Sequence, residues 1–193
     1  MKLTRRLAQL AAWVAVLGMG FASPARAAEC ADLWDWLNTA CRRVVDTYTN
    51  GGNQLLVSGY AWHVPFTWTP EKRAEENPYA WGGGLGRSVE RENGDTDTVY
   101  FLAFSDSHSR PQYNLGYGWS TYWGQRSGVQ AGLGYTAMVV ARNDLFNGLP
   151  FPALLPLASL RYDKATLYST YIPSLGGVNH GSVLYVFGTI GFD

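Results

Sequence analysis

The feature that most constrains the fold of this chain is a strict two-residue alternation of apolar and polar or small side chains. In residues 111–121 (PQYNLGYGWST), one set of alternate positions carries Tyr113, Leu115, Tyr117 and Trp119. The other set carries only polar residues and glycine. Residues 129–140 alternate in the same way, except that the second set ends with the apolar Met138 and Val140. Successive side chains of a strand point to opposite faces, so each segment predicts a strand with one wholly apolar face. Such a face is typical of strands that meet lipid.

Strand-like segments of this kind recur along most of the chain. We count eight, over residues 55–67, 79–91, 96–105, 111–123, 128–142, 153–162, 164–172 and 182–192. Eight is the smallest even number for a membrane barrel, and Asn93-Gly94 is a strong hairpin signal between two of the segments. The fold class that we predict is therefore all-β, an eight-stranded antiparallel outer-membrane β-barrel. The alternative is a soluble secreted β-sandwich.

The first residues predict export. Lys2, Arg5 and Arg6 precede an apolar run that ends near the small-x-small sequence ARA, so residues 1–27 read as a signal peptide. We expect residues 28–193 to form a single β-barrel domain. Removal of residues 1–27 takes away four basic residues and leaves an acidic excess of four. Such a balance gives no basic footprint for nucleic acid, so no nucleic-acid partner is expected.

Residues 30–48 show helical rather than strand periodicity, with apolar residues every three or four positions. They predict an amphipathic helix before a barrel over about 55–192. Trp34 and Trp36 suit a membrane interface, but the same pattern suits a helix that plugs the barrel end. A continuous helix would hold Cys30 and Cys41 about 16 Å apart. We therefore expect no disulfide unless Cys30 leaves the helix and folds back.

The inward positions of the predicted strands are unusually small. Gly116, Gly118, Gly132 and Gly134 leave space in a barrel that side chains normally fill, and Met138 makes part of that space apolar. These residues predict an apolar pocket inside the barrel. The alternative is that the glycines only permit strong curvature and close packing.

Three polar residues fall together once the strands are placed. His63 lies late in the first predicted strand, and Asp106 and Ser107 follow the third, so all three lie at one barrel mouth, which we expect to be extracellular. A histidine, a carboxylate and a hydroxyl are the components of acyl-transfer catalysis. The alternative is an ordinary turn, for which Asp-Ser is a common pair. Three scattered histidines and two cysteines lack ligand spacing, so no metal site is predicted.

Several uncommon strings carry a more specific signal. The chain resembles the lipid A palmitoyltransferase (PagP) family in these strings, which occur in the family's order: WH (62–63), WGGG (81–84), AF-x-DS (103–107), GYGW (116–119), TA-x-V-x-AR (136–142), LPLAS (155–159) and TYIP (170–173).

The resemblance implies a monomeric enzyme of the outer membrane that works among its lipids. It implies transfer of a palmitoyl chain from a glycerophospholipid donor to a lipid A acceptor, with no cofactor. It implies catalytic roles for His63, Asp106 and Ser107, and a pocket that measures the acyl chain, with Gly118 at its floor.

The resemblance also associates lateral lipid access with prolines that interrupt strand pairing. Pro150 and Pro152 keep such positions, whereas Ser58 and Ala80 stand where prolines would be expected. Three alternative functions remain beside acyl transfer: a barrel phospholipase or lipid A deacylase, which passes the acyl group to water, a non-catalytic outer-membrane barrel, and a soluble barrel that binds a fatty ligand.

Overall fold

The elements follow the predicted order. A computed structural model describes residues 30, 34–175 and 180–192, so the predicted signal peptide over 1–27 lies outside the described residues. Helix α2 (Asp35–Asn50) is followed by strands β1 (Gly52–His63), β2 (Gly82–Glu90), β3 (Thr96–Ser105), β4 (Pro111–Trp123), β5 (Gln130–Arg142), β6 (Phe151–Tyr162), β7 (Ala165–Ile172) and β8 (Val183–Phe192). Short helices η3 (Pro65–Thr67), α3 (Pro70–Ala74) and η4 (Phe146–Gly148) lie in the loops.

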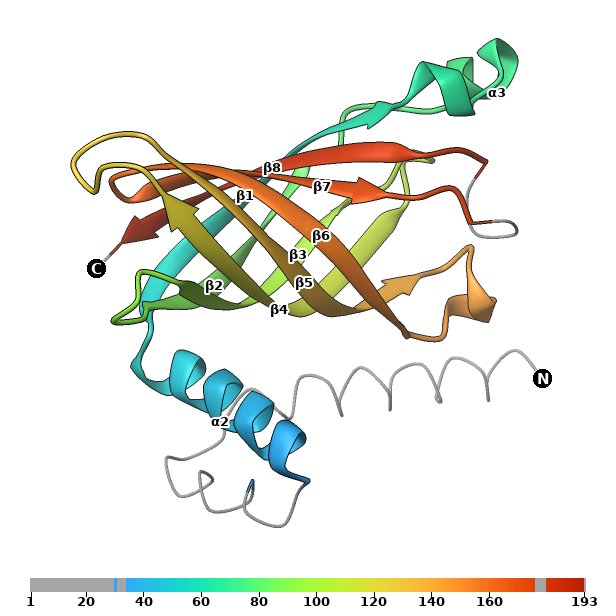
Figure 1. Ribbon diagram of the computed structural model, residues 1–193. Coiled ribbons are helices and arrows are strands. Elements are labelled where there is room, and N and C mark those ends of the chain that lie inside the picture. Colours follow the sequence, from blue (N-terminus) through green and yellow to red (C-terminus); the bar gives the residue numbers. More distant parts are fainter. Residues whose placement is uncertain (1–29, 31–33, 176–179, 193) are drawn as a thin grey trace.

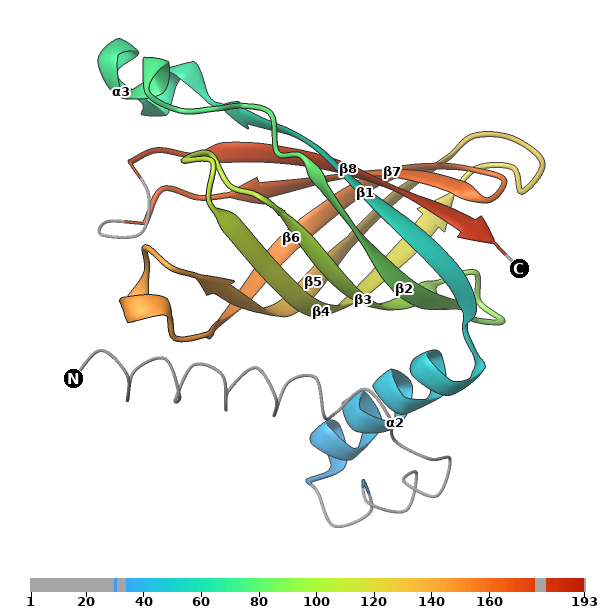
Figure 2. The ribbon, with the colours of Figure 1, turned by 180° about the vertical axis from the view of Figure 1, so that it is seen from behind.

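The eight strands form one closed antiparallel barrel in which each strand pairs with its sequence neighbours (Figure 1). Closure is made by β1 and β8, which pair from Asn53↔Phe192 to His63↔Val183 and lie side by side in Figure 2. The predicted eight-stranded antiparallel barrel with a preceding helix is therefore confirmed. Closure satisfies the backbone groups that a sheet edge would expose, which a lipid environment requires.

The two faces of the strands separate as the alternation predicted. On β5, Thr136, Met138 and Val140 are buried, whereas Leu133, Tyr135 and Val139 are exposed. The same division holds on β4 and β8, so the exposed face is a band of leucine, valine and aromatic side chains around the barrel. In a membrane barrel this face meets lipid. Among the described residues, no helix has the length and apolar content needed to cross a membrane.

The first strand ends earlier than predicted. The segment was expected to run to residue 67, but β1 stops at His63 and the chain turns into η3 and then α3. Pro65 and Pro70 lack the amide donors that a continued ladder needs, and each stands near the start of a helix, where no donor is required. As a result His63 is the last strand residue at its end of the barrel.

The disulfide expectation was wrong. Cys30 and Cys41 form a disulfide, with their Cα atoms 5.9 Å apart. The helix begins at Asp35 rather than at Cys30, so Cys30 lies off the helix and its sulfur reaches back to the first turns of α2. The bridge requires this arrangement, because a helix continuous from residue 30 would hold the two cysteines too far apart.

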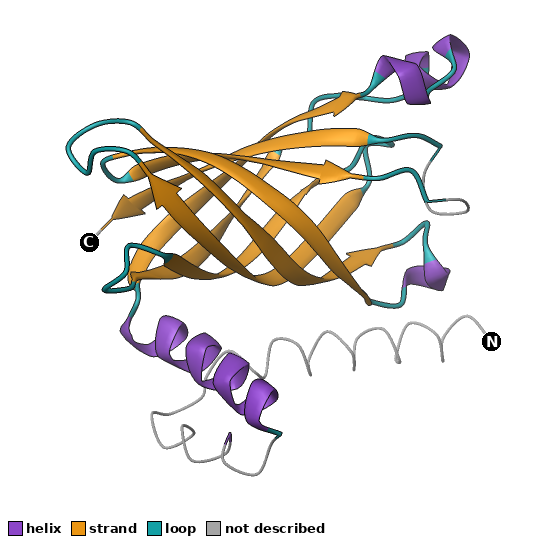
Figure 3. Cartoon of the chain, viewed as in Figure 1, coloured by secondary structure: helices purple, strands orange, loops and turns teal. Residues whose placement is uncertain are grey.

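Helix α2 does not plug the barrel. It lies beside one end, next to the β2–β3 turn (Figures 1 and 3), and packs against β2 and β3. Trp34 and Trp36 remain largely exposed on it, 74% and 66% respectively. Of the two readings left open by its sequence, the structure excludes the plug and leaves an amphipathic helix at the level of the barrel rim.

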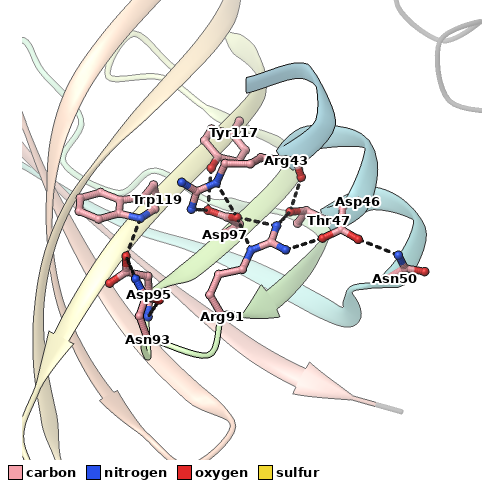
Figure 4. Close-up of polar contacts among 10 residues, drawn as sticks. All are labelled: Arg43, Asp46, Thr47, Asn50, Arg91, Asn93, Asp95, Asp97, Tyr117 and Trp119. Atoms are coloured by element: carbon pink, nitrogen blue, oxygen red, sulfur yellow. Dashed lines mark hydrogen bonds and ion pairs between the residues drawn. The ribbon is translucent and has the colours of Figure 1, made fainter. Parts of the chain in front are cut away.

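A buried carboxylate joins the helix to the barrel (Figure 4). Asp97 on β3 has a fully buried side chain that accepts hydrogen bonds from Arg43 of α2 (Nη2 2.7 Å, Nε 3.1 Å) and from Arg91 Nε (2.7 Å). The hydroxyl of Tyr117 donates a further bond of 2.6 Å to Asp97 Oδ1. Asp97 alternates with the inward-facing Thr96 and Thr98, so it points outward, and α2 with Arg91 covers a charge that would otherwise face the membrane rim.

A second carboxylate makes the docking of α2 sensitive to acid. Hydrogen bonds from Asn50 and from Arg91 lower the pKa of Asp46 on α2 below its ordinary value. A carboxylate with a lowered pKa in the folded state stabilises that state at neutral pH. This stabilisation is lost as the pH falls through the lowered pKa of Asp46.

We predict that Asp97→Asn destabilises the barrel by about 2 kcal/mol, because the partly exposed Arg43 and Arg91 lose the buried carboxylate that both bind. The measurement is urea unfolding in detergent or lipid vesicles, followed by tryptophan fluorescence. Asp163→Asn in the exposed β6–β7 turn is the matched control, since Asn tolerates its positive φ of 50°. Equal unfolding midpoints for the two variants would contradict the role given to Asp97.

Candidate active site

The predicted polar residues lie at the barrel end opposite α2. Strands β1, β3, β5 and β7 run in the same direction and end there, together with the loops that carry α3 and η4 (Figures 1 and 3). The interior at this end is hollow. A cavity of about 620 Å³ runs inward from the mouth, within the range of small-molecule sites.

His63 and Ser107 meet at this mouth. The Nε2 atom of His63 lies 3.1 Å from the Ser107 hydroxyl, across 44 positions of sequence. His63 is only 5% exposed, and the edge of its ring packs on Trp68 with centroids 4.9 Å apart. Trp68 is fixed in turn by a hydrogen bond from its Nε1 to the Ser182 carbonyl, 2.9 Å. The imidazole is therefore held in place with one nitrogen directed at a hydroxyl.

Asp106 lies beside this pair but does not contact the imidazole. Its Oδ1 accepts the backbone N–H groups of His108 (2.9 Å) and Arg110 (2.8 Å), which closes the turn that carries Ser107. Its Oδ2 lies 3.3 Å from Arg142 Nη2. No hydrogen bond or ion pair in the described part of the chain joins Asp106 to His63. The structure thus brings two of the three predicted residues together and places the third behind them.

Arg142, at the end of β5, balances the acidic groups of the mouth. Besides Asp106, it binds both oxygens of Asp144 (3.0 and 2.7 Å). Burial opposes ionisation of Asp144, but the hydrogen bonds and the charge of Arg142, with a backbone hydrogen bond and the charge of His108, together lower the pKa of that carboxyl. Ligand atoms of Asp106, His108 and Asp144 lie within 4.8 Å of one another. The guanidinium already supplies these carboxylates with a cation, which disfavours a metal ion at this cluster.

Glu76 is a site residue that the sequence pattern did not indicate. It follows α3, its side chain is 4% exposed, and its carboxylate lies between two histidines. Glu76 Oε2 is 3.9 Å from His63 Nε2, and Oε1 is 3.5 Å from His108 Nε2. Glu76 thus has a second histidine, His108, as an ion-pair partner. Only the string WH points to this region in the sequence, and nothing in the spacing of residues 64–80 places a carboxylate on His63.

The inward glycines differ in what surrounds them. A side chain at Gly116 would collide with the Tyr100 ring, and one at Gly132 with Tyr122 and Ser159. At Gly134 the Trp119 carbonyl lies in the way. A Cβ at Gly118, in contrast, would meet only ordinary contacts, the shortest 3.7 Å from Leu157. Of the five predicted pocket residues, Met138 lines the cavity, whereas the four glycines are not among the lining residues.

The cavity ends at a layer of aromatic and hydroxyl side chains. The Tyr100 hydroxyl is 2.7 Å from the Thr136 hydroxyl and 3.8 Å from the Met138 sulfur, and all three residues line the cavity. Gly118 pairs with Thr136 across β4 and β5, one inward position nearer to α2 than the pair Gly116↔Met138. Gly118 therefore lies at the level of the floor.

Below this floor the interior is filled by polar contacts. Arg161 binds Gln130 Oε1 (2.8 and 3.0 Å) and Thr96 Oγ1 (3.0 Å), and its guanidinium lies 3.9 Å from the centre of the Tyr122 ring. The barrel is thus solid at the end near α2 and open at the end near His63.

Strands β6 and β7 separate beside the cavity. Their pairing stops at Leu157↔Thr170, although β6 begins six residues earlier, at Phe151. The Pro156 carbonyl accepts a bond from the Thr170 side chain (2.8 Å), so it faces the β7 edge. Alternate residues of a strand share an edge, so Pro156 and Pro152 both lack a donor on that side. Pro152 lines the cavity, while Pro150 lies in the exposed loop before β6.

The seam between β1 and β2 is closed by other contacts. Regular pairing stops at Val57↔Gly83, but Tyr60 and Tyr79 form a bridge beyond it. The Ser58 hydroxyl bonds the Ala80 carbonyl and lies 2.5 Å from the Tyr185 hydroxyl. Ser58 and Ala80, which replace expected prolines, therefore tie this seam together.

Known proteins are similar in sequence to this chain over most of its length. Residues 43–189 match the family model described as "Antimicrobial peptide resistance and lipid A acylation protein PagP". A lipid A acyltransferase PagP of Bordetella parapertussis is 42% identical over 165 residues, which cover 86% of this chain and 90% of that protein. One of Legionella pneumophila is 36% identical over 186 residues, covering 96% and 98%.

Among solved structures, the outer membrane protein Ail of Yersinia pestis aligns with a TM-score of 0.40 at 12% identity, covering 74% of this chain and all of that one. This likeness carries no conclusion about the chain. The sequence matches identify the family, because the family model extends from α2 to the last strand and spans every residue described at the mouth. The chain belongs to the PagP family of lipid A acylation proteins.

Proposed function

We propose that this protein is a lipid A acyltransferase of the outer membrane that moves a palmitoyl chain from a glycerophospholipid to lipid A. The observation that carries the proposal is the hydrogen-bonded pair of His63 and Ser107 at the open end of an apolar cavity. The names of the relatives, lipid A acyltransferase PagP, support the same activity.

The proposed chemistry is proton transfer at the mouth of the cavity. His63 Nε2 takes the proton of the attacking hydroxyl and returns it to the lysophospholipid that leaves. The Ser107 hydroxyl donates to the oxyanion that develops on the ester carbonyl oxygen. Asp106 supports Ser107 by closing the turn that carries it, and it faces Arg142 with its other oxygen. The donor is already an ester, so the proposal needs no cofactor or metal.

The cavity supplies the site for the acyl chain. Its lower walls are apolar or aromatic, with Tyr100, Met138 and Phe187 among them, and its mouth carries the polar residues. A chain bound inside would place its ester near His63 and its methyl end near Tyr100 and Thr136. The gap between β6 and β7, with Pro152 at its edge, is the proposed lateral route by which the donor reaches the cavity from the outer leaflet.

The proposed orientation places His63 on the extracellular side. Short turns of such barrels face the periplasm, and the turns next to α2 are the shorter set. Lipid A lies in the outer leaflet, so this orientation brings acceptor and site together. A phospholipase or deacylase would use the same pair with water as acceptor, and the direction of change in lipid A mass distinguishes these enzymes from a transferase.

We predict that His63→Ala and Ser107→Ala each lower transfer by at least about 100-fold, because each removes a group from the reacting pair. The measurement is transfer of a labelled palmitoyl chain from phosphatidylcholine to lipid A in detergent. Ser127→Ala in the exposed β4–β5 turn, at the other end of the barrel, is the control and should retain activity. Wild-type rates from a folded Ser107→Ala barrel would reject the site. Mass spectrometry distinguishes two routes: an acyl group bound covalently to Ser107 indicates transfer through the serine, and its absence indicates direct transfer.

We predict that Gly118→Met shifts the donor preference toward shorter acyl chains, because its side chain would push into the layer formed by Tyr100 and Thr136. Gly188→Met, on the outward face of β8, is the control, since a Cβ there meets nothing closer than 3.7 Å. Lipid A produced from a mixture of donor chain lengths is compared by mass spectrometry. An unchanged chain-length profile for Gly118→Met would remove this glycine from the pocket floor.

We predict that tying β6 to β7 blocks transfer. Continuing the register past Leu157↔Thr170 brings Pro156 opposite Tyr171, so cysteines at these positions are placed to form a disulfide across the seam. The oxidised variant should lose transfer and the reduced variant should regain it. The unmodified protein, which carries its own disulfide, receives the same treatments as the control. Full activity of the oxidised variant would exclude this route.

A further inference from the structure

We propose that Glu76 is a positioning residue for His63, supplying the negative charge that stabilises its imidazolium during transfer. The inference rests on the proposed function and adds a residue to it. A nearby carboxylate stabilises an imidazolium, and the described carboxylate within 4 Å of the His63 imidazole is Glu76 rather than Asp106. Unlike the carboxylate of a serine-protease triad, it approaches the same nitrogen as the hydroxyl.

The geometry singles out Glu76. It and Ser107 approach the same nitrogen, His63 Nε2, at 3.9 Å and 3.1 Å. When Nε2 takes a proton, the new positive charge forms within reach of the carboxylate. The side chains of His63 and Glu76 are each 4% exposed, so solvent screens their attraction far less than at a surface pair.

Glu76 is held where it lies by its neighbours in the chain. The next residue, Asn77, donates its backbone N–H to the Ser107 carbonyl, 2.8 Å, and its side chain reaches Ser109, 3.5 Å. The preceding helix α3 is capped by Thr69, whose hydroxyl accepts the Lys72 amide. These contacts join the segment that carries Glu76 to the turn that carries Ser107. They hold the Glu76 carboxylate and the Ser107 hydroxyl in fixed positions relative to each other.

The other two carboxylates at the mouth face groups other than His63. Asp106 Oδ1 accepts hydrogen bonds from two backbone amides, and Asp106 Oδ2 faces Arg142. Asp144 binds the same arginine. Glu76 has only histidines as ion-pair partners among the described residues, His63 on one oxygen and His108 on the other. His108 is 46% exposed, so solvent screens its attraction to Glu76 more than it screens that between Glu76 and the buried His63.

The test compares three variants with the unmodified protein in the lipid A transfer assay. Glu76→Gln should lower kcat at least about tenfold with little change in KM, since the loss lies in the transition state rather than in binding. Glu76→Asp keeps the charge and should recover part of kcat. Glu75→Gln, with a 66% exposed side chain beside Lys72, is the matched control and should behave as the unmodified protein.

The pH–rate profile separates charge stabilisation from a structural role. A carboxylate favours the protonated form of a neighbouring imidazole, so Glu76→Gln should move the acid limb to lower pH. His108→Gln is measured alongside, because the other titratable groups around the pair are His108, Asp106, Asp144, Arg142 and His180. If Glu76→Gln still moves the acid limb when His108 is replaced, the shift of that limb is assigned to His63.

The outcomes separate the two proposals. If the unmodified protein transfers palmitate and Glu76→Gln keeps both its kcat and its pH profile, the role of Glu76 is overturned and the proposed function stands. If kcat falls in Glu76→Gln and Glu76→Asp alike, with an unmoved profile, Glu76 is structural and the inference also fails. Absence of transfer by the unmodified, folded protein overturns both.

Discussion

Pairing of β1 with β8 is the constraint on which the rest of the structure depends. It satisfies the two strand edges that an open sheet would expose, and it fixes His63 opposite Val183 at the rim. Closure also sets the inward and outward faces of every strand, because each register follows from its neighbours around the ring. The cavity, its mouth and the apolar outer band are consequences of this closed register.

The two ends of the barrel use polar groups in opposite ways. Near α2, Arg161 and its partners fill the interior, while outside the wall Asp97 is buried under Arg43 and Arg91. Those contacts are satisfied and hold the structure rigid. At the other end the charges are arranged around an open space, and the pair of His63 and Ser107 faces it. Stability and chemistry are thus assigned to different ends of one small barrel.

The mouth distributes its carboxylates between structural and chemical tasks. Asp106 shapes the turn that presents Ser107 and engages Arg142, whereas Glu76 approaches the imidazole itself. This division explains how three acidic groups can crowd one mouth without mutual repulsion dominating. Asp106 and Asp144 share Arg142, whereas Glu76 lies between His63 and His108 and meets a positive charge on His63 only when that imidazole carries a proton.

Much of this architecture was determined by the sequence itself, because strand periodicity is local. The apolar face of residues 111–121, the eight segments and the shared end of His63 and Ser107 followed from spacing alone. Long-range pairing decided the rest. The disulfide needed Cys30 to leave the helix, and the cavity floor needed Tyr100 to cross toward Thr136. Glu76 reaches His63 only because the chain returns from α3 to β2 alongside the turn that carries Ser107, which no local pattern encodes.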